Sequence, residues 1–273
     1  MMVGIRRAIA KRLMGARWIS WGRHERLVEE SRQYKKQIFT LEKVAKAALE
    51  LSGAPVLLPP PELRTHVGRV ADAANFLGQG LSSSSRVIEV FGEAPEGLVL
   101  DWGCGSGRTL NWLSRRPGWR DNYRGCDVDA EAIAWLSGNG FRDAVAVCGD
   151  HPPLPYPDNH FAGLFCFSVL THIHPQNHAA WYRDIHRVLK PGGRAYLTVQ
   201  SGTMLDFGKD FTAEERALYE QNGWLWSERE GHYKHSAPVS EAFTRKALEG
   251  LFEIEAYDAA GYHQMDAVTV RKP

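Results

Sequence analysis

The sequence predicts an α/β fold, a doubly wound and mostly parallel sheet with an N-terminal helical extension. Apolar runs of strand length alternate with helical patterns from about residue 97 to residue 200. Strands that alternate with helices form parallel sheets with right-handed crossovers. The first run ends in a carboxylate and a glycine-rich turn, and a basic helical segment stands at the N-terminus. These observations favour one nucleotide-binding domain behind a helical arm.

The expected elements follow one another closely. A helix leads in from about residue 70, and the first strand covers 97–101. The later strands are expected to end at residue 126 and to cover about 144–148, 161–167 and 195–199. Helices are expected to run to about residue 116, through residue 136, and from a cap at Asn177. Lys190-Pro191-Gly192-Gly193 is expected to end that last helix.

The turn after the first expected strand is the most constrained segment of the chain. Residues 101–107 read Asp-Trp-Gly-Cys-Gly-Ser-Gly. Glycine permits positive φ and lets a ligand approach the backbone. A buried strand, a glycine turn and a helix N-terminus together make a nucleotide cradle.

The order of the acid and the glycines separates two kinds of nucleotide site. Dinucleotide sites use Gly-x-Gly-x-x-Gly with the acid about 20 residues later. Here Asp101 precedes Gly103, Gly105 and Gly107. That order resembles motif I of the class I S-adenosylmethionine (SAM) methyltransferases. A βα turn of another doubly wound protein is the alternative.

Further segments resemble the same family in the same order between about residues 97 and 200. They are Cys148-Gly149-Asp150, Leu154–Ala162, Ser168–His172 and Arg187–Gly193. Ala162 stands where the family commonly has Asp, which weakens that position alone. The resemblance implies a Rossmann-like, seven-stranded methyltransferase sheet with an antiparallel last strand, and SAM as the cofactor.

Two carboxylates are expected to hold the adenosine part of the cofactor. Asp127 lies 20 residues after Gly107 and can accept hydrogen bonds from both ribose hydroxyls. Asp129 is instead expected to begin the next helix, where it interacts favourably with the helix dipole. In the family, the acid at Asp150 receives the adenine amino group. The predicted cofactor-binding residues are Asp101, Gly103, Cys104, Gly105, Gly107, Asp127, Val128, Gly149, Asp150, His151, Phe167 and Ser168.

Histidines are the candidate catalytic residues. Methyl transfer needs the nucleophile aligned with the methyl group, and a hydroxyl acceptor also needs a base. His172 lies just beyond the fourth strand, where several small-molecule and sugar O-methyltransferases have a histidine. Ordering of the loop is its alternative role. His235 and His263 fall in the C-terminal part, where this fold normally builds its acceptor pocket.

The expected activity is methyl transfer from SAM, most simply O-methylation of a small molecule or a sugar or glycan. Leu58–Arg64 and Phe76–Gly80 resemble the lead-in of bacterial methyltransferases associated with glycan assembly. An NAD-dependent oxidoreductase is the rival enzyme class, but the glycine spacing and the lack of a Tyr-x-x-x-Lys pair oppose it. A non-catalytic SAM-binding or scaffold protein would keep Asp101, Gly103 and Asp127 and stays open.

The N-terminal 50 residues and the rest of the chain differ in net charge. Residues 1–50 hold 12 basic and 5 acidic residues, and the remainder holds 21 basic and 27 acidic. The mildly acidic remainder does not favour nucleic acid as a partner. We expect a basic helical arm at 1–54, a Pro-containing connector at 55–80 and a methyltransferase domain at 81–273. Its cofactor half is about 97–200, and its acceptor-side elements are about 201–273.

Three interpretations of the arm stay open: docking on its own domain, contact with an anionic membrane surface, and a mitochondrial presequence. Docking is favoured over membrane contact. Apolar residues over 26–51 form a heptad-like seam that suits a homodimer or a helical hairpin equally.

The cysteines and the hydropathy of the chain indicate the cellular compartment in which the protein is expected. The chain has no Cys-x-x-Cys pair, and we expect small buried thiols in a reducing compartment at Cys104, Cys126, Cys148 and Cys166. Their spacing gives a zinc site little support, and no metal is predicted. No apolar run approaches the roughly 20 residues that span a bilayer. A cytoplasmic protein is expected, with a membrane-peripheral location as the alternative.

Overall fold

The computed structural model describes residues 57–65, 72–207, 211–228, 235–263 and 265–273. The predicted arm at 1–54 and the seam over 26–51 lie outside these residues. The boundary expected between residues 80 and 81 stays a prediction, and helix α3 (Ala73–Phe91) runs through it.

A mixed sheet of eight strands carries the described domain. Seven strands follow the order β3-β2-β1-β4-β5-β10-β9, and β8 (Pro238–Val239) pairs with β5. The parallel strands are β1 (Val99–Trp102), β2 (Tyr123–Asp127), β3 (Val145–Val147), β4 (Phe161–Cys166) and β5 (Leu189–Ser201). β10 (Met265–Arg271) runs antiparallel to both β5 and β9 (Glu253–Tyr262). This topology confirms the predicted fold class, including the antiparallel last strand.

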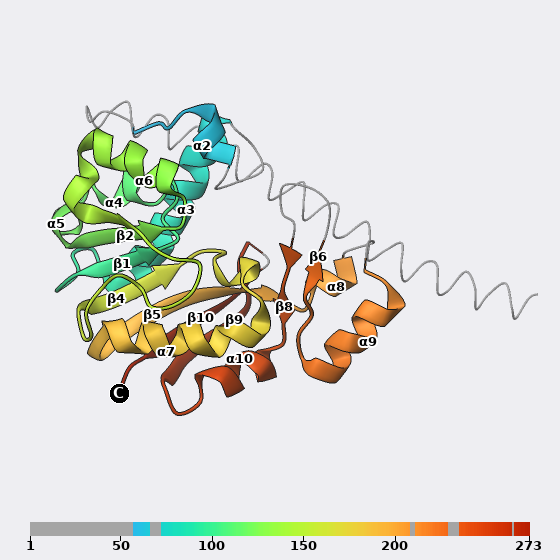
Figure 1. Ribbon diagram of the computed structural model, residues 1–273. Helices are drawn as coiled ribbons and strands as arrows, with labels where there is room; N and C mark the ends of the chain where they lie inside the picture. The colour runs from blue at the N-terminus through green and yellow to red at the C-terminus, as the bar shows by residue number, and fades with distance from the viewer. Residues whose placement is uncertain (1–56, 66–71, 208–210, 229–234, 264) are drawn as a thin grey trace, which may run out of the picture. The chain divides into compact units, whose positions relative to one another are not determined.

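Helices cover both faces of this sheet. Figure 1 shows α4 (Leu110–Leu113) and α6 (Ala130–Leu136) on one side, and α7 (His178–Val188) and α10 (Glu241–Leu248) on the other. The remaining described helices are α2 (Pro61–Thr65), α5 (Trp119–Asn122), α8 (Met204–Phe207) and α9 (Ala213–Asn222). A second, two-stranded sheet pairs β6 (Ser227–Glu228) with β7 (His235–Ser236).

The strands supply alternate residues to the two faces. Leu164 and Cys166 of β4 belong to the core cluster that contains Trp181 of α7. Phe165, between them, belongs to the cluster that contains Leu110 of α4. Successive side chains of a strand point to opposite faces, so each buried strand feeds both layers.

Both predicted helix caps lie at the expected positions. Asp129 precedes α6, and its side chain accepts hydrogen bonds from the backbone N–H groups of Glu131 and Ala132, which confirms its predicted role. Asn177 occupies the N-cap position of α7 as predicted, but its side chain makes no capping hydrogen bond. A 3₁₀ turn over Pro175–Asn177 leads directly into α7.

The described cysteines are all buried free thiols, as predicted. No group of three or more His, Cys, Asp or Glu side chains that could hold a metal ion occurs among the residues the structure describes. Within the same residues, no helix has both the length and the apolar character needed to cross a bilayer.

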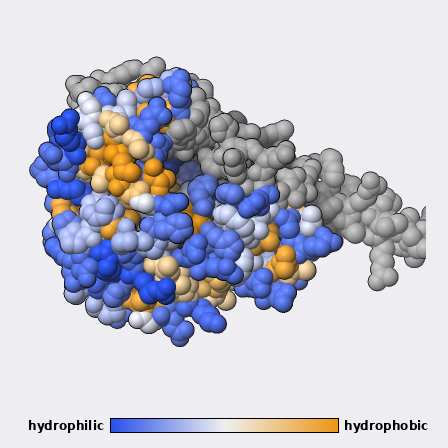
Figure 2. Space-filling view, viewed as in Figure 1, coloured by the Kyte–Doolittle hydropathy of each residue, from blue (hydrophilic) through white to orange (hydrophobic). Residues whose placement is uncertain are grey.

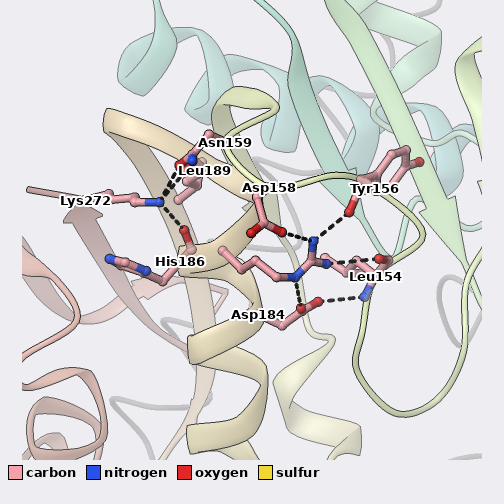
Figure 3. A network of polar contacts seen from close by, with 9 residues as sticks. Leu154, Tyr156, Asp158, Asn159, Asp184, His186, Leu189 and Lys272 are labelled. Atoms are coloured by element: carbon pink, nitrogen blue, oxygen red, sulfur yellow. Dashed lines mark hydrogen bonds and ion pairs between the residues drawn. The ribbon is translucent and has the colours of Figure 1, made fainter.

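An ion pair between the half-buried Arg187 and the buried Asp184 fixes the loop between β3 and β4 to helix α7 (Figure 3). The Arg187 guanidinium donates to Asp184 Oδ1 at 2.7 Å and to the carbonyl of Tyr156 at 2.7 Å. It also reaches the carbonyl of Leu154 at 3.1 Å and Asp158 Oδ1 at 2.9 Å. Asp184 Oδ2 accepts the backbone N–H of Leu154 at 2.6 Å. This network sets the course of the loop between β3 and β4.

We predict that Arg187→Gln lowers the free energy of unfolding by about 2–4 kcal/mol, because it leaves a buried carboxylate and two carbonyls short of donors. The partner carboxylate of Asp184 is only 7% exposed. Arg86→Gln is the matched control, because its partner Glu89 is 62% exposed. That change should cost less than about 0.5 kcal/mol. Urea denaturation of both variants measures the difference, and equal losses would contradict the assignment.

Candidate functional site

A cavity of about 660 Å³ opens at the carboxyl ends of the parallel strands. Gly103 follows β1, Val128 follows β2, Gly149 follows β3 and Ser168 follows β4, and all four line it. In open α/β sheets, ligands bind at this edge, where the strand order reverses. The cavity therefore lies where the sequence predicted a nucleotide site.

The glycine turn forms one wall and needs glycine for steric reasons. Gly103 has φ +82° and Gly107 has φ +83°. A Cβ at Gly103 would lie 2.3 Å from Val169 Cγ2, and one at Gly107 would lie 2.7 Å from Leu136 Cδ2. Gly103 lines the cavity, whereas Gly107 lies outside the lining. The first glycine thus opens the cavity, and the last permits close packing against α6.

Asp127 joins the turn to the end of β2. Its Oδ2 accepts the backbone N–H of Gly105 at 2.7 Å, and its Oδ1 accepts the N–H of Asp129 at 2.9 Å. Burial raises the pKa of Asp127, while these backbone donors oppose the rise. Each carboxylate oxygen keeps further acceptor capacity. Asp127 lines the cavity and can therefore accept hydrogen bonds from a ligand as well.

Apolar side chains and an acid also line the cavity. Val128 is 57% exposed, and the Trp102 and Trp181 rings pack together with centroids 4.6 Å apart. All three line the cavity. Figure 2 shows a hydrophobic area over the region of α6 and β2 on an otherwise mostly hydrophilic surface. An exposed apolar side chain at a cavity is suited to cover an apolar ligand face.

Asp150 supplies this acid. Its Oδ1 lies 2.8 Å from His151 Nδ1, and this interaction lowers the pKa of Asp150. Asp150 lines the cavity, whereas His151 does not. His151 thus contacts the carboxylate and not the cavity. An exposed carboxylate here can accept a hydrogen bond from an amino group.

Asp101 occupies a different position from the one expected of a ligand-binding acid. It is buried, and its Oδ2 accepts the Tyr123 hydroxyl at 2.8 Å. Burial raises the pKa of Asp101 to about 7. Asp101 does not line the cavity, and neither does the buried Cys104. A Cβ at Gly125 would lie 2.9 Å from Cys104 Sγ, so this thiol packs against β2.

Another wall comes from the loop after β4 and the β9–β10 hairpin. Phe167, Ser168, His172, Tyr262, His263 and Met265 line it. The Phe167 and Tyr262 rings lie 4.6 Å apart. The N–H of Ser168 donates to Thr198 Oγ1 at 2.8 Å, which ties this wall to β5.

Two non-glycine residues of this wall have left-handed backbones. Ser168 has φ 61° and His263 has φ 46°. Such conformations cost about 1–3 kcal/mol each and cluster at ligand sites. His263 Nε2 also lies 3.4 Å from Ser82 Oγ of α3. The strained turn thus presents an imidazole at the cavity beside α3.

The two imidazoles of this wall favour the neutral form. Burial lowers the pKa of His172, and the charge that His235 can carry lowers it further. Burial and the nearby Arg108 guanidinium lower the pKa of His263. A histidine that stays neutral near pH 7 can accept a proton. His235 lies outside the lining.

Several residues that line the cavity were not among the predicted site residues: Gln79, Trp102, Arg108, Asp129, Cys148, Val169, Ile173, Trp181, Tyr262 and Met265. Arg108 follows the last glycine of the turn and donates to Gln79 Oε1 of α3 at 2.6 Å. Its adjacency to Gly107 is a signal that could have identified it. Gln79 and Tyr262 reach the cavity from segments far from the motifs, so no local pattern marks them.

Comparisons with known proteins agree with this geometry. Residues 100–197 match the family described as "Methyltransferase domain". The chain is 31% identical over 135 residues to a malonyl-[acyl-carrier protein] O-methyltransferase of Herminiimonas arsenicoxydans, and the match covers 49% of each chain. It is 26% identical over 186 residues to a ubiquinone/menaquinone biosynthesis C-methyltransferase of Vibrio campbellii, covering 65% of this chain and 71% of that one. The match to the first relative thus spans about half of that protein's length.

A solved structure shows the same fold. It is a 1,6-didemethyltoxoflavin-N1-methyltransferase of Burkholderia thailandensis with bound 1,6-didemethyltoxoflavin and S-adenosylhomocysteine. The similarity has a TM-score of 0.50 at 21% identity, and it covers 80% of this chain and 92% of that one.

We predict that Asp101 makes stability depend on pH. Its folded pKa of about 7 lies above the ordinary 3.8, so its contribution is present below about pH 4 and is lost as pH rises through 7. Asp101→Asn cannot ionise and should flatten the fall in the free energy of unfolding between pH 4 and pH 8. Denaturant titrations across this range test it, with the exposed Asp143→Asn as the control. An unchanged slope in Asp101→Asn would show that the carboxyl ionises normally.

Proposed function

Because the chain belongs to the class I SAM-dependent methyltransferases, we propose that it transfers the SAM methyl group to an oxygen of a small molecule. The observation that carries this proposal is the division of the cavity. A glycine turn and carboxylates line one part, and an apolar wall with two imidazoles lines another. The first part suits the cofactor, and the second suits a neutral acceptor.

The cofactor part offers a partner for each portion of SAM. Asp127 would accept from the ribose hydroxyls, Val128 would cover the adenine, and Asp150 would accept from its amino group. Arg108 stands at the α3 side of the glycine turn and offers the positive charge that a methionine carboxylate requires. When bound, SAM supplies a methyl group on a positively charged sulfur.

The proposed acceptor part favours an apolar acceptor molecule whose nucleophile is a hydroxyl oxygen. The acids among the cavity residues lie at the end of β2 or just after β2 and β3, and they are Asp127, Asp129 and Asp150. A cationic amine would therefore meet no carboxylate beside Phe167 and Tyr262. Since burial keeps His172 and His263 neutral, either can take a hydroxyl proton as the oxygen attacks.

An apolar acceptor also favours a small molecule over a glycan. Phe167, Ile173, Tyr262 and Met265 give the cavity apolar contacts that a bare sugar would use poorly. Incubation with methyl-labelled SAM and separate small-molecule and glycan fractions of a cell extract tests this choice. Mass spectrometry should find the label in the small-molecule fraction. Label confined to the glycan fraction would overturn it, and no transfer to any fraction would favour a non-catalytic SAM-binding protein.

We predict that calorimetry finds S-adenosylhomocysteine binding in the micromolar range and negligible NAD binding. Asp127→Asn should weaken S-adenosylhomocysteine by about 10- to 150-fold, because it removes charge-assisted acceptor bonds worth about 1.5–3 kcal/mol. Asp121→Asn, an exposed change on α5, should leave the affinity unaltered. Tight NAD binding without S-adenosylhomocysteine binding would support the oxidoreductase alternative. Unaltered affinity in Asp127→Asn would mean that another carboxylate holds the ribose.

We predict that His172→Gln lowers kcat by about 10²- to 10⁴-fold at saturating acceptor, because proton removal is lost. Affinity for S-adenosylhomocysteine and Tm should change little. In the unaltered protein, kcat should rise with pH through a group below the ordinary histidine pKa of 6.5, since burial lowers the pKa of His172.

His263→Gln is the parallel variant that separates the two imidazoles. If His172 is the base, the His263 change should affect KM more than kcat. A loss of less than tenfold in kcat for His172→Gln would exclude the base role and direct attention to His263. A joint loss of Tm and cofactor affinity would instead assign His172 to loop ordering.

A further inference from the structure

The β9–β10 hairpin contains a bulge close to its turn. Two strand pairs enclose this irregular segment, Tyr262 with Met265 and Asp258 with Ala267. Three residues of β9 (259–261), which we name the β9 bulge, thus stand against Asp266 alone. The pairing of the two strands is shifted by two residues across this segment. A bulge disrupts the ladder locally and re-aims the side chains beside it.

The backbone of the β9 bulge is folded tightly. Ala260 has φ 53°, a left-handed conformation that is uncommon for a residue with a side chain. A Cβ at Gly261 would lie 2.5 Å from Asp258 Cβ and 2.9 Å from the Asp258 carbonyl oxygen, so this position needs glycine. A backbone of this kind persists only where surrounding contacts determine it. The bulge therefore requires a contact that holds it.

Asp266 supplies such a contact from β10. Its Oδ1 accepts the backbone N–H of Ala260 at 2.9 Å, and its Oδ2 accepts the Tyr257 hydroxyl at 2.9 Å. The residue is buried, with an exposed fraction of 5%. A buried carboxylate is costly unless donors satisfy it, and a backbone amide inside a bulge needs an acceptor outside the ladder. The carboxylate and the bulge thus satisfy each other.

The residues next to the bulge face the cavity. Tyr262, His263 and Met265 all line it, and we name these three residues the hairpin tip. The Tyr262 ring packs against Phe167 with centroids 4.6 Å apart, and His263 Nε2 lies 3.4 Å from Ser82 Oγ. Both contacts depend on where the tip lies, and the shift in pairing sets that position.

We propose that Asp266 is a positioning residue, which holds the β9 bulge and thereby places the hairpin tip against the acceptor. What this inference says of the acceptor rests on the proposed function. Asp266 itself lies outside the cavity lining. It acts through Ala260, whose N–H it binds, and from there through the tip.

The rest of the hairpin has other support. Ladder pairs between β9 and β10 continue from Ala267 to Arg271, and β10 also pairs with β5 from Met265 to Arg271. Loss of the Asp266 carboxylate should therefore release the tip and leave the sheet in place. A residue that only stabilised the fold would have no selective effect on the tip.

Proton NMR titration of the ligand-free, full chain tests this inference through His263. Burial and the nearby Arg108 guanidinium lower the pKa of His263. Asp266→Leu keeps a similar side-chain volume and removes both acceptor oxygens. The released tip should then lose burial, and the His263 midpoint should rise toward the ordinary 6.5. His263→Gln identifies the resonance of His263 by its loss.

Two control variants isolate the bond to the bulge. Asp266→Asn keeps an acceptor oxygen for the Ala260 N–H, and its amide can donate to the Tyr257 hydroxyl oxygen. Tyr257→Phe removes only the donor to Oδ2. Both variants should keep the His263 midpoint of the unaltered protein. Hydrogen exchange at the Ala260 amide, followed by NMR, should be fast in Asp266→Leu and slow in both controls.

Three results would overturn the inference. They are an unmoved His263 midpoint in Asp266→Leu, an equal rise in Asp266→Asn, and an equal rise in Tyr257→Phe. Asp266→Ala also removes both acceptor oxygens and provides a second variant should the leucine variant not fold.

An activity measurement separates this inference from the proposed function. In an active preparation, methyl transfer to the small-molecule fraction of the extract should fall by about tenfold or more in Asp266→Leu. Affinity for S-adenosylhomocysteine should stay constant, because the residues proposed to hold it lie elsewhere in the cavity. Unaltered transfer beside a raised midpoint would contradict the placement of the tip against the acceptor. A raised midpoint in a protein without methyl transfer would uphold the role of Asp266 in the bulge and refute only the proposed function.

Discussion

The hydrogen bond from the Gly105 N–H to Asp127 Oδ2, 2.7 Å long, joins the two strand ends on which the cavity depends. It forms because the glycine turn folds back at positive φ and brings a backbone donor to the end of β2. The other oxygen of Asp127 accepts from Asp129, whose own side chain begins α6. One carboxylate thus sets the relative positions of the turn, the end of β2 and the following helix.

The two parts of the cavity are built differently as a result. The part that we propose for the cofactor comes from consecutive strand ends, whose positions follow from the parallel register of β1, β2 and β3. The part that we propose for the acceptor combines the loop after β4 with the β9–β10 hairpin, and it contains the two strained residues Ser168 and His263. Strain of this kind persists only where surrounding contacts hold it. The Ser168 bond to Thr198 and the His263 contact with Ser82 supply such contacts.

The fold and the cavity residues at the strand ends could be predicted because their signals are local. Strand length, the glycine spacing and the acid at the end of β2 each show in a few consecutive residues. Asp101 shows the limit of this reasoning. Its neighbour Trp102 lines the cavity, whereas Asp101 is buried on Tyr123. Strand alternation sends these two side chains to opposite faces, and the motif does not state which face each takes. Tyr262 and Gln79 reach the cavity only through tertiary packing, so no sequence pattern near the motifs reveals them.

The distribution of charge follows from the same division. Carboxylates gather where β2 and β3 end, and there backbone donors or His151 contact them. On the wall that contains His172 and His263, burial favours the neutral form of each imidazole over its charged form. A fixed carboxylate there would have to be desolvated each time an apolar acceptor entered, at a cost of several kcal/mol. A neutral imidazole avoids that cost and, in the proposed function, would become charged only as it accepts the proton. Under that proposal, one cavity would hold the cofactor by charge and the acceptor by shape.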